Sequence, residues 1–167
     1  MSGKKQINNE NRYKVIPRSL IFIFNDRSEV LLIRGSSQKN LWSGLLNGIG
    51  GHIEAGEDIF ESAARELREE TGLINISINY CGQIMIDVEN NLGVSLFLFR
   101  GESIEEINVT SKEGQVNWVP ISALKDAPVV EDLPVLIPKV YEYRKTDPLI
   151  IAKYTYDQDG ALRISFR

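Results

Sequence analysis

Residues 57–71 constrain the fold more than any other segment of this chain of 167 residues. At about 100° per residue, the apolar side chains of the segment gather on one side of a helix, the side that would pack against a sheet. Acidic residues at its start suit a helix N-terminus, and Gly72 suits a C-terminal cap. The segment therefore predicts one amphipathic helix, whose buried side would consist of Ile59, Phe60, Ala63, Ala64 and Leu67.

The rest of the chain consists of short apolar or alternating segments, which predict β-strands. Turn residues at 25–28 and 157–160 predict two hairpins. A second helix is expected at 133–145, with a kink or a break at Pro138. Strands in mixed order around one strong helix indicate an α+β fold rather than alternating βαβ units. The other expected elements are strands at 74–88 and 93–100, a strand at 116–119 and a helical turn at 121–124.

Composition narrows the class of protein. The net charge is −4, so the electrostatic footprint of a protein that binds a nucleic acid polymer is absent. Cys81 is the single cysteine, which excludes an intrachain disulfide and fits a reducing cytoplasm. No apolar run reaches the length of a membrane span. We expect a flexible leader at residues 1–12 and a single domain at 13–167.

Three glutamates of the expected helix form a second stripe. Glu66, Glu69 and Glu70 lie at positions i, i+3 and i+4, where like charges repel and weaken an isolated helix. A divalent cation would remove this repulsion, and hard oxygen ligands suit magnesium or manganese. The alternative is a solvated charged face, stabilised by ion pairs such as Arg65 with Glu61 or Glu69.

The neighbourhood of these glutamates decides between the two interpretations. It matches the Nudix box, G-x5-E-x7-R-E-U-x-E-E-x-G-U with U a bulky aliphatic residue, at every fixed position. The chain therefore resembles the Nudix hydrolases, over residues 17–167. The matching positions are Gly51, Glu57, Arg65, Glu66, Leu67, Glu69, Glu70, Gly72 and Leu73.

The resemblance implies a fold and a reaction. The fold is an α/β/α sandwich with a mixed sheet, in which the box forms a loop-helix-loop. The reaction is attack by water on a phosphorus of a nucleoside diphosphate joined to another group, with magnesium ions neutralising the phosphate oxygens. The implied metal ligands are Glu66, Glu69, Glu70 and the carbonyl of Gly50, with Arg65 and Glu57 as orienting partners.

The resemblance also bears on the nucleotide. Residues 46–51 are similar to a stretch in enzymes that hydrolyse oxidised purine nucleoside triphosphates such as 8-oxo-dGTP, which implies base contact for Asn47. The adjacent carboxylates of Glu131 and Asp132 take the place of the Asp-Asp pair of those enzymes. An amide and a carboxyl together offer donors and acceptors to a purine edge. The alternatives are a turn cap for Asn47 and a helix N-terminus for the acidic pair.

Three more residues are candidates for the site. Leu41 lies in a loop from which it could contact a base, and Arg34 ends the second expected strand, where it could bind phosphate. In this family the general base comes from the box helix, here Glu69, or from a later loop, here Glu113. For Glu113, a plain surface turn is the alternative.

The leading interpretation is hydrolysis of a nucleoside triphosphate to a monophosphate and pyrophosphate. The same chemistry could act on ADP-ribose, a nucleotide sugar or a dinucleotide. A non-catalytic nucleotide sensor would not need the full set of glutamates, and an isomerase of isoprenoid diphosphates needs catalytic positions that are not found here. The expected partner is thus a small nucleotide, with the oligomeric state left open, a homodimer included.

Replacing Glu113 with Gln tests its assignment as a base. If the carboxylate accepts the proton of the attacking water, the substitution lowers turnover by orders of magnitude, measured as the steady-state rate with saturating nucleotide and magnesium. An unaltered rate would remove Glu113 from the site.

Overall fold

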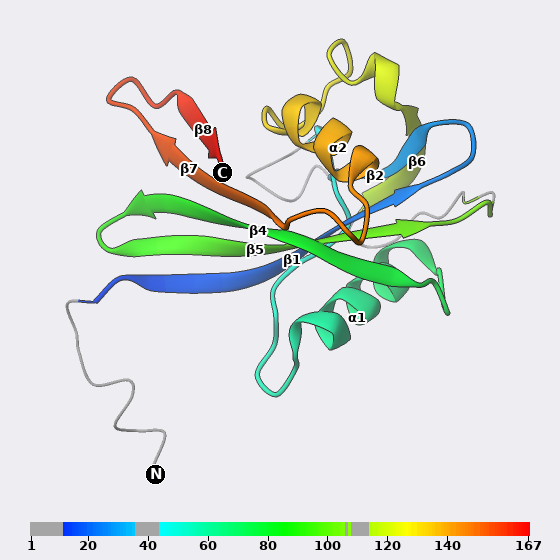
Figure 1. The fold of residues 1–167 in the computed structure, drawn as a ribbon, viewed down its shortest axis with the longest axis horizontal. Helices are drawn as coiled ribbons and strands as arrows, with labels where there is room; N and C mark the ends of the chain where they lie inside the picture. The colour runs from blue at the N-terminus through cyan, green and yellow to red at the C-terminus, as the bar shows by residue number, and fades with distance from the viewer. Residues whose placement is uncertain (1–11, 36–43, 106, 108–113) are drawn as a thin grey trace.

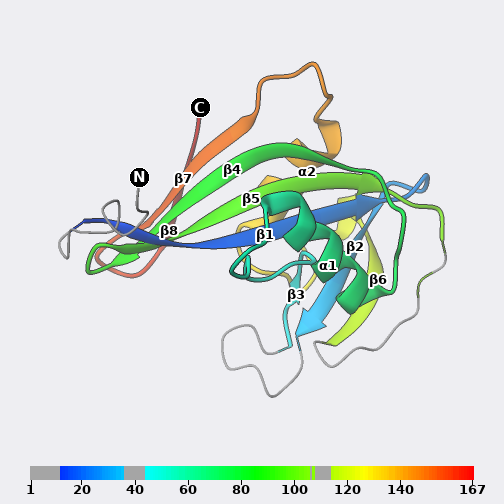
Figure 2. The same cartoon turned by 90° about the horizontal axis from the view of Figure 1, so that it is seen from below.

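The fold has three layers. The computed structural model describes residues 12–35, 44–105, 107 and 114–167. One mixed sheet carries helix α1 (Ile59–Thr71) on one face and helix α2 (Leu133–Glu142) on the other (Figure 1). The helix α1 lies over strands β1 and β6 (Figure 2). This arrangement confirms the expected α+β class and its α/β/α layering.

The sheet has the strand order β3-β2-β1-β5-β4-β7-β8, with β6 paired to β2. The pairs β1–β5 and β4–β7 are parallel, and the other pairs are antiparallel. Only a short 3-10 helix, η2 (Ile121–Ala123), and α2 stand between β6 and β7. The strands are β1 Lys14–Phe24, β2 Glu29–Gly35, β3 Leu46–Asn47, β4 Ile78–Glu89, β5 Leu92–Glu102, β6 Gly114–Pro120, β7 Ile150–Tyr156 and β8 Leu162–Phe166.

Strands β1 and β2 separate directly after the turn that joins them. They pair only at Phe24 and Val30, and β2 then runs beside β6 along its full length. The edge of β1 that β2 leaves is filled by the segment that follows β3, through isolated bridges from Ile21 to Ile49 and from Arg18 to His52. The predicted hairpin is therefore confirmed at its turn, but its strands diverge. The space between them is taken by residues 48–53, which follow β3 and are called the glycine-rich segment below.

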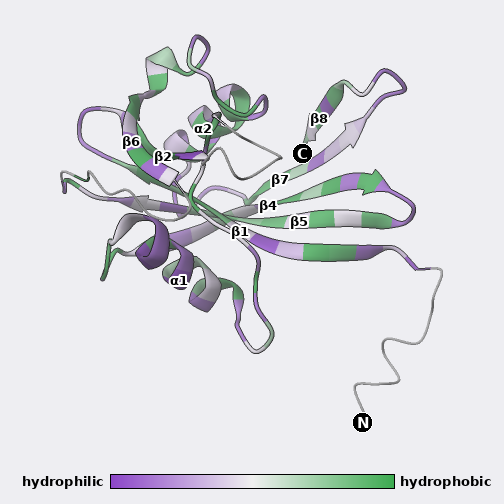
Figure 3. Ribbon diagram, turned by 180° about the vertical axis from the view of Figure 1, so that it is seen from behind, coloured by the Kyte–Doolittle hydropathy of each residue, from purple (hydrophilic) through white to green (hydrophobic). Residues whose placement is uncertain are grey.

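Alternation along β1 divides the core between the two faces. Leu20, Phe22 and Phe24 pack on the side of α2, whereas Ile21 and Ile23 pack on the side of α1. Both sets are buried because each face of the sheet carries a helix. Figure 3 shows the hydrophobic stretches of the strands against the largely hydrophilic α1.

The remaining elements agree with the sequence except at their ends. The β4–β5 turn has Asn90 and Asn91 at φ 52° and 60°, the left-handed conformation that a tight hairpin turn requires. The helix α2 ends three positions before the predicted residue 145 and runs on past Pro138, so the expected break is not found. In the described part of the chain, no helix is long and apolar enough to cross a membrane.

Helix α1 ends where predicted and begins two residues later than predicted, at Ile59, and its buried side is rotated. Asp58 caps the first turn and Gly72, at φ 76°, caps the last. Phe60 is 48% exposed and Ala64 is exposed, contrary to the predicted face. The reason is the glycine-rich segment, on which the helix packs through the buried Ser62, with its Oγ 3.4 Å from the carbonyl of His52.

Replacing Asp58 with Ala tests the cap. The Asp58 carboxylate accepts hydrogen bonds from the backbone N–H groups of Phe60 and Glu61, at 2.8 and 2.9 Å. Their loss should lower the free energy of unfolding by about 1 kcal/mol, measured by urea denaturation. The matched control is Asp126→Ala, an exposed aspartate after η2, which should leave the stability within about 0.5 kcal/mol of the native value.

Candidate active site

Arg65 connects the loop before α1 with the middle of the helix through hydrogen bonds. Its Nε and Nη2 donate to both carboxylate oxygens of Glu57, at 2.6 and 2.9 Å, in a bidentate pair. Its Nη1 donates to Glu66 at 2.8 Å and to Glu69 at 3.4 Å. Its Nη2 also reaches the carbonyl of His52, at 3.0 Å. One guanidinium thus fixes the loop before α1 against the helix. The orienting role of Arg65 and Glu57 in the reaction stays a prediction.

These contacts set the charge state of the cluster. Hydrogen bonds from Arg65, and then one from the backbone N–H of Glu54, hold the pKa of Glu57 at about 2. The pKa of Arg65 is raised, first through its hydrogen bonds to Glu57 and then to Glu66. The pair is therefore fully ionised at neutral pH, and its charges are available to orient the neighbouring carboxylates.

Glu70 is the most buried of the three glutamates. It is 5% exposed, and its Oε2 accepts a hydrogen bond from the backbone N–H of Gly50 at 3.0 Å. Gly50 has φ 142°, and a Cβ there would collide with the carbonyl oxygen of Ser19. Only glycine therefore lets the chain pass close to β1 and present its N–H to Glu70.

Glu66 depends on the next glycine. A Cβ at Gly51 would collide with the Glu66 carboxylate, so the absence of a side chain leaves room for that group. The side chain of Glu69, by contrast, is 52% exposed and pairs with Arg65 at 3.4 Å. The three glutamates thus differ in their surroundings, from buried Glu70 to solvated Glu69.

The donor set suits a hard divalent cation. Carboxylate oxygens of Glu66, Glu69 and Glu70 lie along one helix, and Gly50 is held against Glu70. Such oxygens are the ligands that magnesium and manganese prefer. In the described ranges, however, no three acidic, histidine or cysteine side chains already converge as a chelate. The residues therefore fit the metal by chemistry and placement, and ion binding would require their side chains to rotate.

A cavity of about 460 Å³ lies beside this cluster, on the face of the sheet that carries α2. Asn47, Glu131 and Asp132, which the sequence predicts to read the base, all line it. Gly50 lines it as well, so this residue touches both the cavity and the glutamate cluster. The remaining walls are mainly apolar side chains: Leu20, Ile86, Val88, Val94, Leu96, Val130 and Leu162.

Four further polar residues of this cavity were not predicted from the sequence. They are Arg18 and Ser19 from β1 and Tyr154 and Tyr156 from β7. Alternation along β1 places Arg18 on the same face as Leu20, which was the available signal. The sequence around Tyr154 and Tyr156 contains no signal that predicts their place in the cavity, because β7 reaches the cavity by pairing in parallel with the distant strand β4.

Other predicted residues lie elsewhere. Arg34 is exposed and donates from Nη1 to the carbonyl of Gly44 at 2.7 Å, and it does not line the cavity. Leu41 and Glu113 fall outside the described residues, so their assignments remain predictions.

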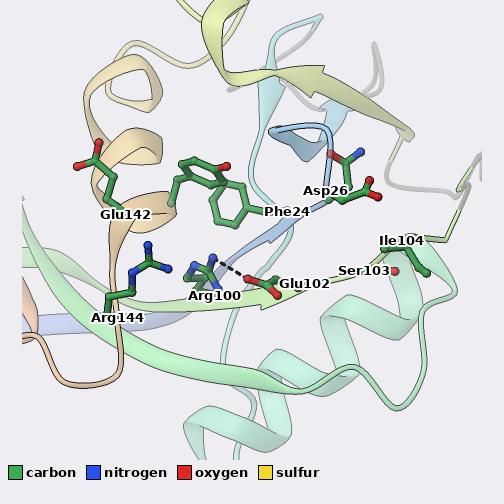
Figure 4. A pocket seen from close by; sticks show the side chains of 10 residues that line it. Phe24, Asp26, Arg100, Glu102, Ser103, Ile104, Glu142 and Arg144 are labelled. Atoms are coloured by element: carbon green, nitrogen blue, oxygen red, sulfur yellow. Dashed lines mark hydrogen bonds and ion pairs between the residues drawn. The ribbon is translucent and has the colours of Figure 1, made fainter.

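A second cavity, of about 350 Å³, lies between the ends of β1 and β5 and the end of α2 (Figure 4). Its charged side chains have both signs, and Arg100 is paired with Glu102 at 2.8 Å. None of the predicted site residues lines it. The first cavity, beside the glutamates, is therefore the candidate active site.

Comparison with known proteins identifies the family and the fold of the chain. The NUDIX domain family matches residues 15–140. The oxidized purine nucleoside triphosphate hydrolase of Danio rerio is 30% identical over 56% of this chain, a match that spans 60% of that relative's length. The Mus musculus protein of the same name is 25% identical over 81% of this chain and 86% of its own. A MutT protein structure from Bacillus halodurans has the same fold, with a TM-score of 0.73 at 23% identity over 92% of this chain and 97% of its own.

Replacing Gly51 with Ala tests the room left for Glu66. The new Cβ would displace the carboxylate, so we expect the affinity for magnesium, measured by titration calorimetry, to fall about tenfold. The melting temperature should change little, because the end of a flexible side chain can move aside. In a Glu66→Ala background the same substitution should have no further effect on affinity, and an additional loss there would contradict this account.

Proposed function

We propose that this chain cleaves a nucleoside triphosphate to a monophosphate and pyrophosphate. The chain belongs to the NUDIX domain family and is a hydrolase of phosphorus-containing anhydrides. The observation that carries the proposal is the position of Gly50, whose backbone lines the cavity and donates to Glu70. A nucleotide with its base in the cavity would direct its phosphates past this glycine toward the glutamates.

The cavity has the chemistry of a base site. Its walls are apolar, as the faces of a planar ring require, and its polar groups are few. The amide of Asn47 and the carboxylates of Glu131 and Asp132 can hydrogen-bond to the edge of that ring. Asn47 and the adjacent pair Glu131 and Asp132 come from two distant parts of the chain, so their meeting in one cavity supports a common ligand.

A purine, and an oxidised purine in particular, is the base that we propose. The relatives from Danio rerio and Mus musculus carry that substrate class in their names. Glu131 is exposed and Asp132 is buried, so the carboxylate of Asp132 is the better placed to select among bases, because solvent competes with it least.

The chemistry is assigned to the cluster around α1. Glu66, Glu69 and Glu70, with the carbonyl of Gly50, would hold magnesium or manganese, which when bound neutralises phosphate oxygens and activates water. Arg65 keeps Glu66 and Glu69 in place through its own hydrogen bonds. We propose that the proton of the attacking water is accepted by Glu69 or by Glu113.

A panel of nucleotides tests the proposal. The native chain, Glu69→Gln and the control Glu142→Gln, on the opposite face of the sheet, are each given 8-oxo-dGTP, dGTP, 8-oxo-dATP or ADP-ribose with magnesium. We expect pyrophosphate from the triphosphates, a loss of roughly two orders of magnitude in Glu69→Gln, no change in Glu142→Gln, and no turnover in excess EDTA. If the chain releases AMP from ADP-ribose and cleaves none of the triphosphates, ADP-ribose is the substrate and the triphosphate proposal is wrong. Binding of a nucleotide without turnover would indicate a sensor.

A further inference from the structure

Two polar side chains of the cavity, those of Tyr154 and Asp132, are buried. Tyr154 is 2% exposed, and its hydroxyl oxygen has no partner of acceptable geometry within the described residues. Asp132 is 8% exposed, and although it stands at the N-terminus of α2, its side chain caps no backbone N–H. Burying a polar group costs free energy unless it is hydrogen-bonded, so the Tyr154 hydroxyl and the Asp132 carboxylate each call for a partner or a function.

The two groups act on each other. Burial raises the pKa of Tyr154, and the charge of Asp132 raises it further. Burial also raises the pKa of Asp132, and Tyr154 offsets part of that rise. The hydroxyl is therefore close enough to favour the ionised carboxylate, even though the pair falls short of full hydrogen-bond geometry. Because the hydroxyl oxygen is inaccessible to solvent, a ligand in the cavity meets the carboxylate and not the hydroxyl.

The amide of Asn47 supplies a complementary group in the same cavity. Its Oδ1 accepts a hydrogen bond from the backbone N–H of Gly48 at 2.8 Å, which leaves its Nδ2 to donate to a ligand. A guanine-type base presents the acceptor O6 beside N–H donors, whereas an adenine-type base presents the N6 donor at the corresponding position. A donating amide and an accepting carboxylate match the guanine-type edge.

We propose that Tyr154 is a positioning residue for base recognition. Its hydroxyl donates to Asp132 and keeps that carboxylate an acceptor. The cavity therefore prefers a guanine-type over an adenine-type edge. The inference rests on the proposed function, because it takes the cavity to hold the base of a nucleoside triphosphate. Without the hydroxyl, the buried carboxyl is more readily protonated and becomes a donor, which suits the N1 acceptor of adenine.

The other titratable groups of the cavity are less suited to this task. Glu131 and Tyr156 are exposed and Arg18 is half-buried, so solvent screens their effect on the base edge. Tyr156 therefore offers a matched control, a tyrosine on the same strand and in the same cavity that is 46% exposed.

The test compares Tyr154→Phe with Tyr156→Phe. For each variant, kcat and KM are measured with 8-oxo-dGTP and with 8-oxo-dATP, which share the triphosphate and differ in the base edge. In Tyr154→Phe we expect KM for 8-oxo-dGTP to rise about tenfold with kcat within about twofold, and the preference for it over 8-oxo-dATP to fall about tenfold. Tyr156→Phe should leave the preference unchanged.

A double-mutant cycle shows whether Tyr154 acts through Asp132. Asp132→Asn should abolish the preference by itself, and adding Tyr154→Phe should then change nothing further. A preference that survives Asp132→Asn, or equal effects of Tyr154→Phe in both backgrounds, would overturn the inference and leave the proposed function standing. If the native chain cleaves neither triphosphate, the proposed function fails, and this inference with it.

Discussion

The guanidinium of Arg65 is the contact on which the site depends. It joins a loop carboxylate, a loop carbonyl and two helix carboxylates, so the segment before α1 and the helix behave as one rigid piece. A lysine could not make these contacts, because a single ammonium lacks the planar fork of donors. Without Arg65, the acidic residues of α1 would repel one another, and the loop would lose its main attachment to the helix.

The divergence of β1 and β2 explains how this piece reaches the substrate. Had the two strands stayed paired, the edge of β1 would be closed to the segment from Ile49 to Ile53. Because β2 turns away to β6, that segment takes its place and passes from the face with α2 to the face with α1. Recognition and chemistry thus lie on opposite faces of one sheet and meet at Gly50.

Much of this arrangement could be predicted from local sequence. The spacing of Glu66, Glu69 and Glu70, the cap at Gly72 and the Asn-Gly at Asn47 are each contained within a few residues. The structure has the three glutamates on one helix, the cap at its end and Asn47 in the wall of the cavity. The parallel pairs β1–β5 and β4–β7 carry no such local signal, because their partners are far apart in the chain. Residues that depend on those pairs, such as Tyr154, therefore could not be assigned from the sequence.

The rotation of α1 shows a second limit. The helical periodicity identifies the apolar side chains of α1 but not the segments that cover them. In the structure the helix packs on the glycine-rich segment as well as on the sheet, with Ser62 at the contact. Phe60 is left at the border, where its ring contacts that of Phe99 edge-on at 5.2 Å. A helix face is thus fixed by tertiary neighbours that no single segment reveals.

The long parallel pairing of β1 has a consequence for biosynthesis. Along the edge of β1 that pairs with β5, Lys14 lies opposite Leu92 and Phe24 opposite Glu102, and β2 pairs with β6, which comes later still in the chain. A ribosome therefore releases the most apolar strands of the protein well before the strands that cover their edges. Exposed edges of this kind promote aggregation of incomplete chains, so the yield of folded protein should depend on the speed of translation and on chaperones that shield the nascent N-terminal half.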